Sequence, residues 1–481
     1  MRALYAVIAV SLVCTGARAQ ETCPAGEAWD AQMAMCMPIP PLTNPPQAGG
    51  LPSPSEPLYL EHMTSHGHMH EMSNAGMYDM MISPDGCASW EYYLFGMSMC
   101  QPRPDVRGRF SGMVMGHLAL TDTGVAGTRS RHSIAAPNWI MADGGIDLSH
   151  WNRIELDVML TAERWTFPDR GYALPLQIGE ENQNGVPYVD AQHPHSSPLM
   201  GLTLTDVLSF SSTKTRILRV WFSPRGETTD GPIAFMHRAT GTVNPDAPLG
   251  HHLGQDVGHV TSTVIGAGFY FSNRLGATAI EASTFHGREP SPTEIDLPVA
   301  TPDSAALRLV QQFGRHLTAA VSVAYVNSPE GDGANTVRIS ASAYTEHRLG
   351  GSHNWRAHTS WIWGGVTNYD HAPFLTSFGI EATFSDEVNT PFARLEVLHR
   401  TPAELAIASA TPNDPQFVGS LTLGYVRHVV SLWGFDLGVG VSGTLGILPA
   451  DFQPAYGGPV IASGKLFLDI RFIKMWSLGA R

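Results

Sequence analysis

The sequence lacks a long apolar run beyond its first residues. After residue 19, no uninterrupted apolar stretch reaches the roughly 18 residues that a membrane-spanning helix needs. Sustained helical periodicity is also missing, and only 15% of the 481 residues are charged, whereas Gly numbers 48 and Pro 35. This composition is typical of many strands joined by turn-rich connections. If the protein lies in a membrane, the sequence predicts that strands cross it.

Motifs of several functional classes are missing too. A formal net charge of −14 without a basic stripe argues against a nucleic-acid partner. The chain has no P-loop, no dinucleotide fingerprint and no Gly-x-Ser-x-Gly elbow between a strand and a helix. The best catalytic candidate is Ser360 beside His358, but such pairs are commonplace. We therefore expect no enzymatic activity, and keep a lipid-modifying enzyme of the outer membrane only as a second alternative.

The first 19 residues predict a secretory signal peptide. Arg2 supplies the positive charge, residues 3–13 the apolar run, and residues 17–19 a small-residue cleavage site. Composition divides the rest into a Pro-rich segment over 20–60, a Met/His-rich segment over 61–106 and a strand-rich domain over 107–481. We expect the two N-terminal segments to be flexible and to lie in the periplasm.

Four cysteines remain after the signal peptide, in two pairs that each enclose twelve residues. An even number in an exported chain favours two local disulfides, Cys23–Cys36 and Cys87–Cys100. Thiolate ligation of a metal is the alternative, although the spacing within each pair is wide for it.

The Met/His-rich segment is the most biased part of the chain. Thioethers suit Cu(I), and imidazoles suit copper, zinc or nickel, so a flexible strip of both can capture copper. The alternative is a tail whose methionines merely pack on neighbouring surfaces. The candidate metal ligands in this segment are His62, Met63, His66, His68, Met69, His70 and Met72.

From residue 109 onward, apolar and polar residues alternate. Ile154, Leu156 and Val158 alternate with charged residues, and the same pattern recurs over 354–363 and 433–442. A soluble sandwich also alternates. Runs of about ten residues or more, aromatics towards their ends and charges on the opposite face instead favour a lipid-facing barrel with a wet lumen. The final run, 464–472, resembles the aromatic-ended last strand of outer-membrane barrels, followed here by a tail over 473–481.

We predict an all-β fold, a transmembrane antiparallel barrel of about 16 strands (range 12–18). The expected strands start near residues 109, 152, 173, 199, 214, 258, 274, 304, 315, 334, 353, 374, 390, 417, 432 and 460. Short turns such as 273–276 alternate with long connections such as 182–198, 224–257, 287–303 and 401–416. Outer-membrane barrels have this asymmetry, with short turns in the periplasm and long loops outside.

Several histidines fall in the long connections, which should share one mouth of the barrel. Imidazoles and carboxylates that converge can bind a divalent metal. Alternatively, these side chains hold an inward-folded plug together by hydrogen bonds. The candidate ligands are His193, His195, His237, His251, His252 and His259, with His286, Asp190, Asp246, Asp256 and Glu289 nearby.

The same loops carry a resemblance. The stretches VDAQHPHS, GPIAFMHR and FHGREP, and the DAP-to-HH segment, resemble signatures of a family of bacterial outer-membrane β-barrel proteins over about residues 90–300. In that family an Asp usually follows His-Pro-His, where this chain has Ser196. The Met/His-rich leader before a barrel is similar in design to copper-resistance outer-membrane proteins, which implies copper handling.

The sequence thus predicts an outer-membrane barrel that binds or handles copper or another transition metal through its periplasmic segment. Outer-membrane lipids are its expected surroundings, and periplasmic metal-handling proteins its expected partners. The alternative is a porin-like channel for small polar solutes.

Overall fold

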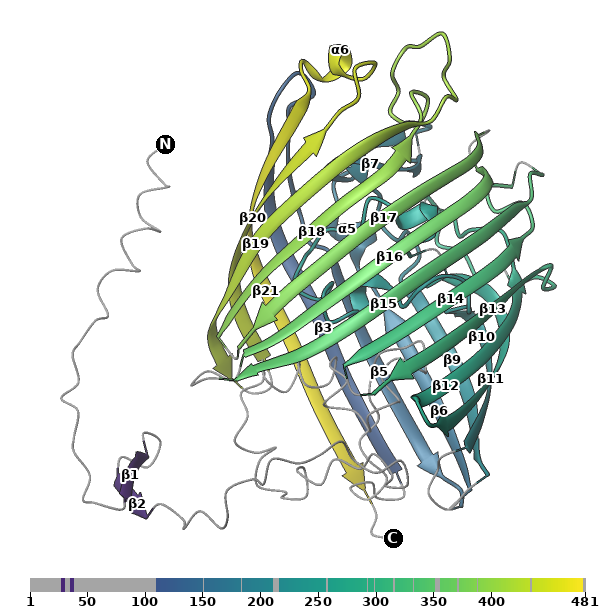
Figure 1. The fold of residues 1–481 in the computed structure, drawn as a ribbon, viewed down its shortest axis with the longest axis vertical. Coiled ribbons are helices and arrows are strands. Elements are labelled where there is room, and N and C mark those ends of the chain that lie inside the picture. The colour runs from purple at the N-terminus through teal and green to yellow at the C-terminus, as the bar shows by residue number, and fades with distance from the viewer. Residues whose placement is uncertain are drawn as a thin grey trace. The chain divides into compact units, whose positions relative to one another are not determined.

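The computed structural model describes residues 27–30, 35–38 and 110–478, apart from 150, 183, 211–215, 257, 292, 298, 315, 332, 351–354, 370–371, 387 and 433–434. The chain divides into two units, Met1–Pro57 and Leu58–Arg481. In the first unit, strands β1 (Glu27–Asp30) and β2 (Met35–Pro38) form an antiparallel hairpin. The second unit contains a closed antiparallel barrel (Figure 1).

The barrel wall is built from strands of 5 to 19 residues, most of them long enough to cross a bilayer when tilted. They are β3 (Phe110–Val125), β4 (Arg131–Ala135), β5 (Asn138–Asp147), β6 (Asn152–Leu160), β9 (Leu199–Ser209), β10 (Arg216–Gly226), β11 (Thr261–Asn273), β12 (Gly276–His286), β13 (Ser304–Phe313), β14 (Leu317–Val326), β15 (Thr336–Gly350), β16 (Trp355–Tyr369), β17 (Ala372–Ser385), β18 (Asn389–Arg400), β19 (Gln416–Leu432), β20 (Phe435–Ile447) and β21 (Val460–Leu478).

Within the described residues, these strands occupy sixteen positions in the wall. Both β4 and β5 pair with β3, β4 along its C-terminal part and β5 along its N-terminal part, so together they fill one position. The ring closes where β21 pairs with β3. The predicted transmembrane barrel of about 16 strands is confirmed.

Three details of the sequence prediction are wrong. The run that starts near 173 is not a wall strand: β7 (Tyr172–Glu181) pairs only with β8 (Pro187–Gln192), in a separate two-stranded sheet. The wall strand β5 was not predicted, because Asp143, Gly144 and Gly145 interrupt its apolar alternation. The residues after Phe472 are not a tail either, since β21 continues to Leu478 opposite Phe110.

Outward and inward faces of the wall differ in chemistry, as the alternation predicts. Leu156, Trp361 and Val441 on the outer face are 46–48% exposed. Their outward neighbours along the strands are also apolar, so the outer surface presents the hydrophobic band that lipid requires. The inner face carries Arg, Asp, Glu, Ser and Thr. These inner side chains are largely buried, so much of the lumen is filled rather than wet.

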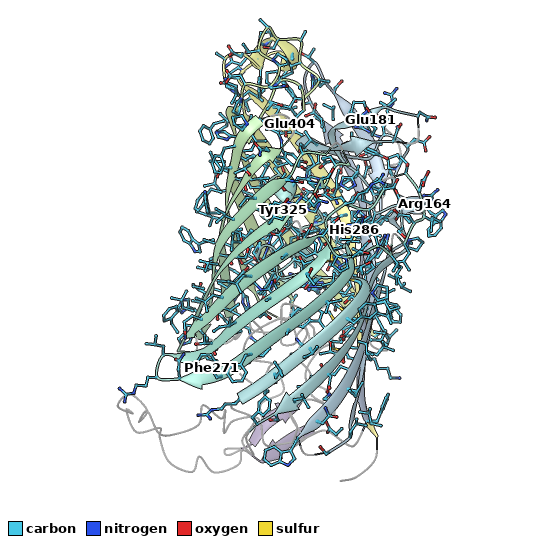
Figure 2. All side chains as sticks on the ribbon, turned by 90° about the vertical axis from the view of Figure 1, so that its right-hand side faces the viewer. Arg164, Glu181, Phe271, His286, Tyr325 and Glu404 are labelled. Atoms are coloured by element: carbon cyan, nitrogen blue, oxygen red, sulfur yellow. The ribbon has the colours of Figure 1, made fainter. Side chains whose placement is uncertain are left out.

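The two ends of the barrel differ in the length of their connections. Turns such as 274–275 and 386–388 join strands at one end, whereas 161–198, 227–260, 287–303, 401–415 and 448–459 lie at the other (Figure 1). Phe271, near the short-turn end, and Glu181 and Glu404, at the opposite end, are labelled in Figure 2. The predicted alternation of loop lengths is confirmed, except that only residues 370–371 join β16 to β17 at the long-loop end.

No helix in the described ranges is long and apolar enough to span a membrane.

Two long connections fill the lumen. The connection 161–198 carries α5 (Glu163–Thr166) and the β7–β8 hairpin. The connection 227–260, which we call the plug, carries η3 (Phe235–His237) and η4 (His251–Leu253). Nearly every plug residue from 228 to 256 is buried. Figure 1 shows α5 and β7 enclosed by wall strands.

Buried polar contacts fasten the plug to the wall. Arg238 donates two hydrogen bonds to Glu381 on β17, at 2.9 and 3.0 Å. Thr240 contacts the same carboxylate at 2.6 Å and the Ser360 hydroxyl at 2.7 Å. Arg394 donates to the backbone carbonyl of Asp246 at 2.7 Å. These groups are shielded from water, so removing one partner would leave the other buried and unsatisfied, which destabilises the fold.

At η4 the plug backbone touches the wall backbone. Gly254 has a left-handed φ of +84°, and a Cβ on Gly364 of β16 would lie only 2.1 Å from the Leu253 carbonyl oxygen. Glycine is therefore required on both sides of this contact. The contact fixes the position of the two histidines that begin η4.

Candidate metal site

Five of the six predicted loop histidines meet in one cavity. His193 and His195 follow β8, so the β7–β8 hairpin in the lumen, which we call the lumen hairpin, positions them. His251 and His252 begin η4, and His259 immediately precedes β11. All five line a cavity of about 70 Å³, together with Asp230, Glu289, Arg225 and Arg338 among others. Such a volume holds a metal ion with a few water molecules.

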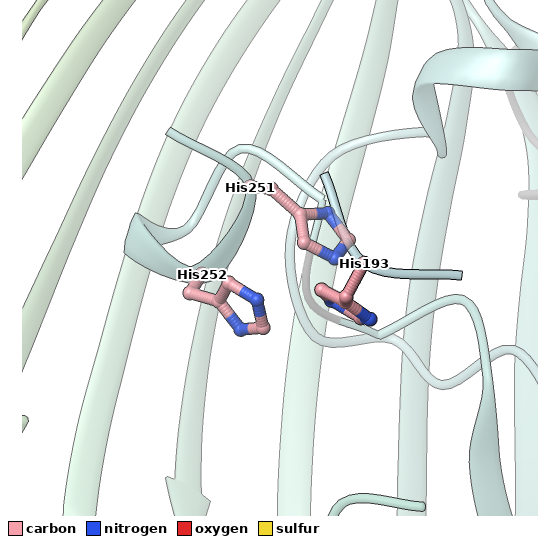
Figure 3. A group of neighbouring side chains, drawn as sticks. All are labelled: His193, His251 and His252. Carbon is pink, nitrogen blue, oxygen red and sulfur yellow. The ribbon is translucent and has the colours of Figure 1, made fainter. Parts of the chain in front are cut away.

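The first group with metal-binding geometry consists of His193, His251 and His252. One ring nitrogen from each lies within 4.8 Å of those of the other two. Ring centroids are 4.5 Å apart for His251 and His252, and 5.7 Å apart for His193 and His252. Figure 3 shows the three rings converging from two chain segments. A triad of imidazoles is a donor set used for Zn²⁺ with an open fourth position.

The second group shares His251 with the first. It consists of His251, Asp256 and His259, whose ligand atoms also lie within 4.8 Å of one another. His195 extends this group, because its Nε2 lies 3.0 Å from Nε2 of His259. His251 is thus the common member of two adjoining three-ligand groups.

An oxygen atom faces Nδ1 of each of the five rings. Nδ1 of His195 lies 2.8 Å from Glu163, and Nδ1 of His193 lies 3.2 Å from the Pro194 carbonyl. The remaining Nδ1 contacts are His259 to the Asp256 carbonyl at 3.0 Å, His251 to the Asp256 carboxylate at 3.5 Å, and His252 to Glu289 at 3.6 Å. The three shorter contacts, those of His193, His195 and His259, are hydrogen bonds of the kind that fixes the tautomer of a metal-binding histidine and directs Nε2 to the ion.

The site contains both neutral and charged histidines. Burial lowers the pKa of His193 and of His251 to about 3, and the neighbouring imidazoles add to the shift, so both rings are neutral at pH 7. Burial opposes charge on His259 as well, but the Asp256 carboxylate raises the pKa of that ring to about 9. Neutral imidazoles are the form that binds metals, so His193 and His251 can bind an ion directly, whereas His259 must first release a proton.

Glu289 connects the site to the barrel wall. It accepts a 2.6 Å hydrogen bond from Arg338 on β15, while Arg338 also reaches Asp230 at 3.3 Å. Against the effect of burial, His252 and Arg338 hold the pKa of Glu289 well below its usual range, so the carboxylate stays ionised. Arg338 of the wall strand β15 therefore holds the negatively charged Glu289 beside His252.

His237 lies outside this cavity. Its ring makes an edge contact with Trp139, at a centroid distance of 6.2 Å, and Nδ1 lies 3.3 Å from Glu227. Among the nearby residues, Asp256 and Glu289 join the site. Asp190 instead bonds Arg129 and Tyr456, Asp246 bonds Tyr172, and His286 pairs with Asp303.

The other predicted ligands cannot be placed. His62, Met63, His66, His68, Met69, His70 and Met72 lie outside the described residues, as do Cys23, Cys87 and Cys100 and the side chain of Cys36. Copper capture by the leader and the two disulfides therefore stay predictions.

Glu163 was not predicted as a site residue. It lies 32 positions before His195 in α5, a four-residue helix that no periodicity could indicate. The same carboxylate accepts the backbone N–H of His195 at 3.0 Å. It therefore holds both the backbone and the ring of this histidine.

Replacing Glu163 by glutamine should weaken divalent metal binding about tenfold or more, because the ring of His195 loses its charged acceptor. Chelator competition with Zn²⁺ on the purified barrel measures the change. The matched control is Glu294→Gln, an exposed glutamate in the 287–303 connection. An unchanged Kd in Glu163→Gln would show that this carboxylate does not orient a ligand.

The candidate catalytic pair is enclosed in the lumen. Ser360 and His358 are both buried on the inner face of β16, and the Ser360 hydroxyl bonds Thr240 of the plug. Neither side chain faces the lipid surface of the barrel.

Comparisons with known proteins concern the fold alone. Neither a protein-family model nor a curated relative matches this sequence. Similar solved structures include Salmonella typhi OmpF in complex with daunomycin (9% identity, TM-score 0.47, 75% of this chain and 97% of that chain). Another is Pseudomonas putida OprB at high pH (12%, 0.44, 77% and 95%). A third is the outer-membrane channel DcaP of Acinetobacter baumannii (10%, 0.39, 76% and 96%).

The closed wall, its apolar outer face and its unequal connections define the class of this protein. It is an outer-membrane β-barrel.

Proposed function

We propose that this protein is an outer-membrane metal-binding barrel that takes a divalent transition-metal ion into the site between the plug and the lumen hairpin. The observation that carries the proposal is the convergence of donor atoms in two adjoining groups, His193/His251/His252 and His251/Asp256/His259, within 4.8 Å of one another in each group. Side chains that only held the plug by hydrogen bonds would not need to bring these donor atoms together around one cavity.

The donor set narrows the choice of metal. The five imidazoles with Asp256 and Glu289 offer nitrogen and oxygen, and none of the described residues that line this cavity carries sulfur. Such donors suit Zn²⁺, Cu²⁺ or Ni²⁺ better than Cu(I). The predicted copper-capturing leader is compatible with this choice, since copper in its divalent form fits the site.

The test is a metal titration of the full chain. We expect wild-type protein to bind at least one equivalent of Zn²⁺ or Cu²⁺ that His193→Ala/His251→Ala/His259→Ala does not bind. Replacing His62, His66, His68 and His70 by alanine should leave that equivalent in place. Equal binding by wild type and the loop variant would overturn the proposal. Loss only in the leader variant would assign metal handling to residues 61–106.

A porin-like channel is the second candidate, supported by the polar inner face of the wall. Arg308, Glu281 and Arg338 all face the lumen. The obstacle is the plug, whose buried residues occupy the path from the long-loop mouth. Solute passage therefore requires that the plug move, which conductance measurements can test.

A further inference from the structure

The methionines of the barrel gather at one place in the lumen. All six whose side chains the structure describes belong to one buried cluster and are 1–6% exposed. They are Met113, Met115, Met141, Met159, Met200 and Met236. Elsewhere the inner face is dominated by charged and hydroxyl side chains. The cluster also contains eleven other apolar or aromatic residues, among them Trp139, Ile217 and Tyr344, and the methionines distinguish it from the other buried clusters of the described residues.

Strand register places four of these methionines in a row. Met115 of β3 is the pairing partner of Met141 on β5, which is also the partner of Met159 on β6. Met159 in turn lies opposite Gly201 on β9, next to Met200. Neighbouring strands are about 4.8 Å apart, so each thioether is within reach of the next.

The row ends at a small cavity beside the five-histidine site. Met159 and Met200 from the wall and Met236 from η3 line it, together with His237 and His259. Its volume is about 10 Å³, about the space of one ion or water molecule. Glu227 also lines this cavity and can balance a positive charge.

We propose that Met159, Met200, Met236 and His237 form a second site, which binds a soft monovalent cation such as Cu(I). Thioethers are neutral, soft ligands and prefer Cu(I) to divalent zinc or nickel. The imidazole of His237 completes a set of four ligands. Unlike thiols, the thioethers carry no proton that must be released before they bind. This assignment gives His237, which lies outside the divalent site, a place in metal binding.

The proposal does not depend on metal binding at the five-histidine site. His259 lines both cavities, but none of the four proposed ligands lines the cavity of the five histidines. The two sites also differ in donor chemistry. The protein can therefore lack Zn²⁺ binding at the five-histidine site and still bind a soft cation at the methionine site, or the reverse.

Methionine-to-leucine substitution separates ligation from packing, since leucine nearly conserves volume in a core. The test variant is Met159→Leu/Met200→Leu/Met236→Leu. The matched control is Met113→Leu/Met115→Leu/Met141→Leu, which changes the same number of methionines in the same cluster away from the cavity. Full-length chains keep the contribution of the leader equal in every sample.

Ag(I) is the probe, because it has the ligand preferences of Cu(I) and needs no reductant. We expect the test variant to bind one Ag(I) fewer per chain than wild type, and the control to bind the same number as wild type. X-ray absorption should show fewer Ag–S contacts in the test variant alone. Resistance of each purified barrel to trypsin checks that the plug is folded.

Two results would overturn the proposal. Undiminished Ag(I) binding by the test variant would show that the methionines only pack. An equal loss in the test and control variants would show that the ion does not lie in this cavity. If wild-type protein binds Ag(I) as expected but binds no Zn²⁺, the five-histidine site fails and this site stands.

Discussion

Replacing His251 by alanine is expected to weaken divalent metal binding by at least about 100-fold. His251 belongs to both three-ligand groups, so its loss leaves two ligands in each. Replacing His252 or His259 by alanine removes a ligand from one group only and leaves the other complete. Those two variants should therefore lose less affinity than His251→Ala.

The measurement is chelator competition with Zn²⁺ on folded, full-length protein. His132→Ala is the matched control, because His132 also contacts an aspartate, Asp122 at 2.6 Å, but its side chain is 64% exposed on the rim. Equal affinity in His251→Ala and His132→Ala would refute a shared ligand. Equal losses in His251→Ala, His252→Ala and His259→Ala would instead indicate one site built from all of these histidines.

Removing the plug is expected to turn a poorly conducting barrel into an open pore. A short Gly/Ser linker can replace residues 232–256, since Gly226 and Thr261 are paired neighbours on adjacent strands. Arg238→Met should act in the same direction, because the buried Glu381 loses its bidentate partner and keeps only Arg394 and Thr240, a loss of up to about 3–5 kcal/mol. Single-channel conductance in planar bilayers measures both variants.

Arg216→Met is the control, since Arg216 is an exposed arginine at the short-turn end of β10. We expect it to conduct like wild type. If wild-type protein already conducts as well as the deletion variant, the plug does not obstruct the lumen and the protein is an open channel. If the deletion variant does not conduct, other segments close the lumen.

The wall could be predicted from sequence because lipid imposes a simple pattern on it. Leu156 and Trp361 had to alternate with inward polar residues, and each pair of wall strands needed one short turn. Prediction failed where the alternation of apolar and polar residues is not caused by contact with lipid, or is interrupted. The β7–β8 hairpin alternates like a wall strand but lies in the lumen, and β5 contains Asp143 and two glycines that hide its alternation.

The candidate site could be predicted only in part. Histidines in loops at one mouth were expected to meet, and five of them do. Asp256 and Glu289 were expected near them, but Glu163 was not, because its place beside His195 depends on how the 161–198 connection packs in the lumen. The methionine row was hidden for a similar reason, since it exists only through the register of β3, β5 and β6.

The pairing between β3 and β21 has a consequence for the order of assembly. It runs from Ser463 opposite Val125 to Leu478 opposite Phe110, so the seam joins the first and last wall strands. Contacts so distant in sequence form late, because the intervening chain must first be arranged. The plug and the lumen hairpin are both synthesised before β21. We therefore expect both segments to be enclosed before β3 and β21 pair. Their histidines then come together inside a barrel that closes last.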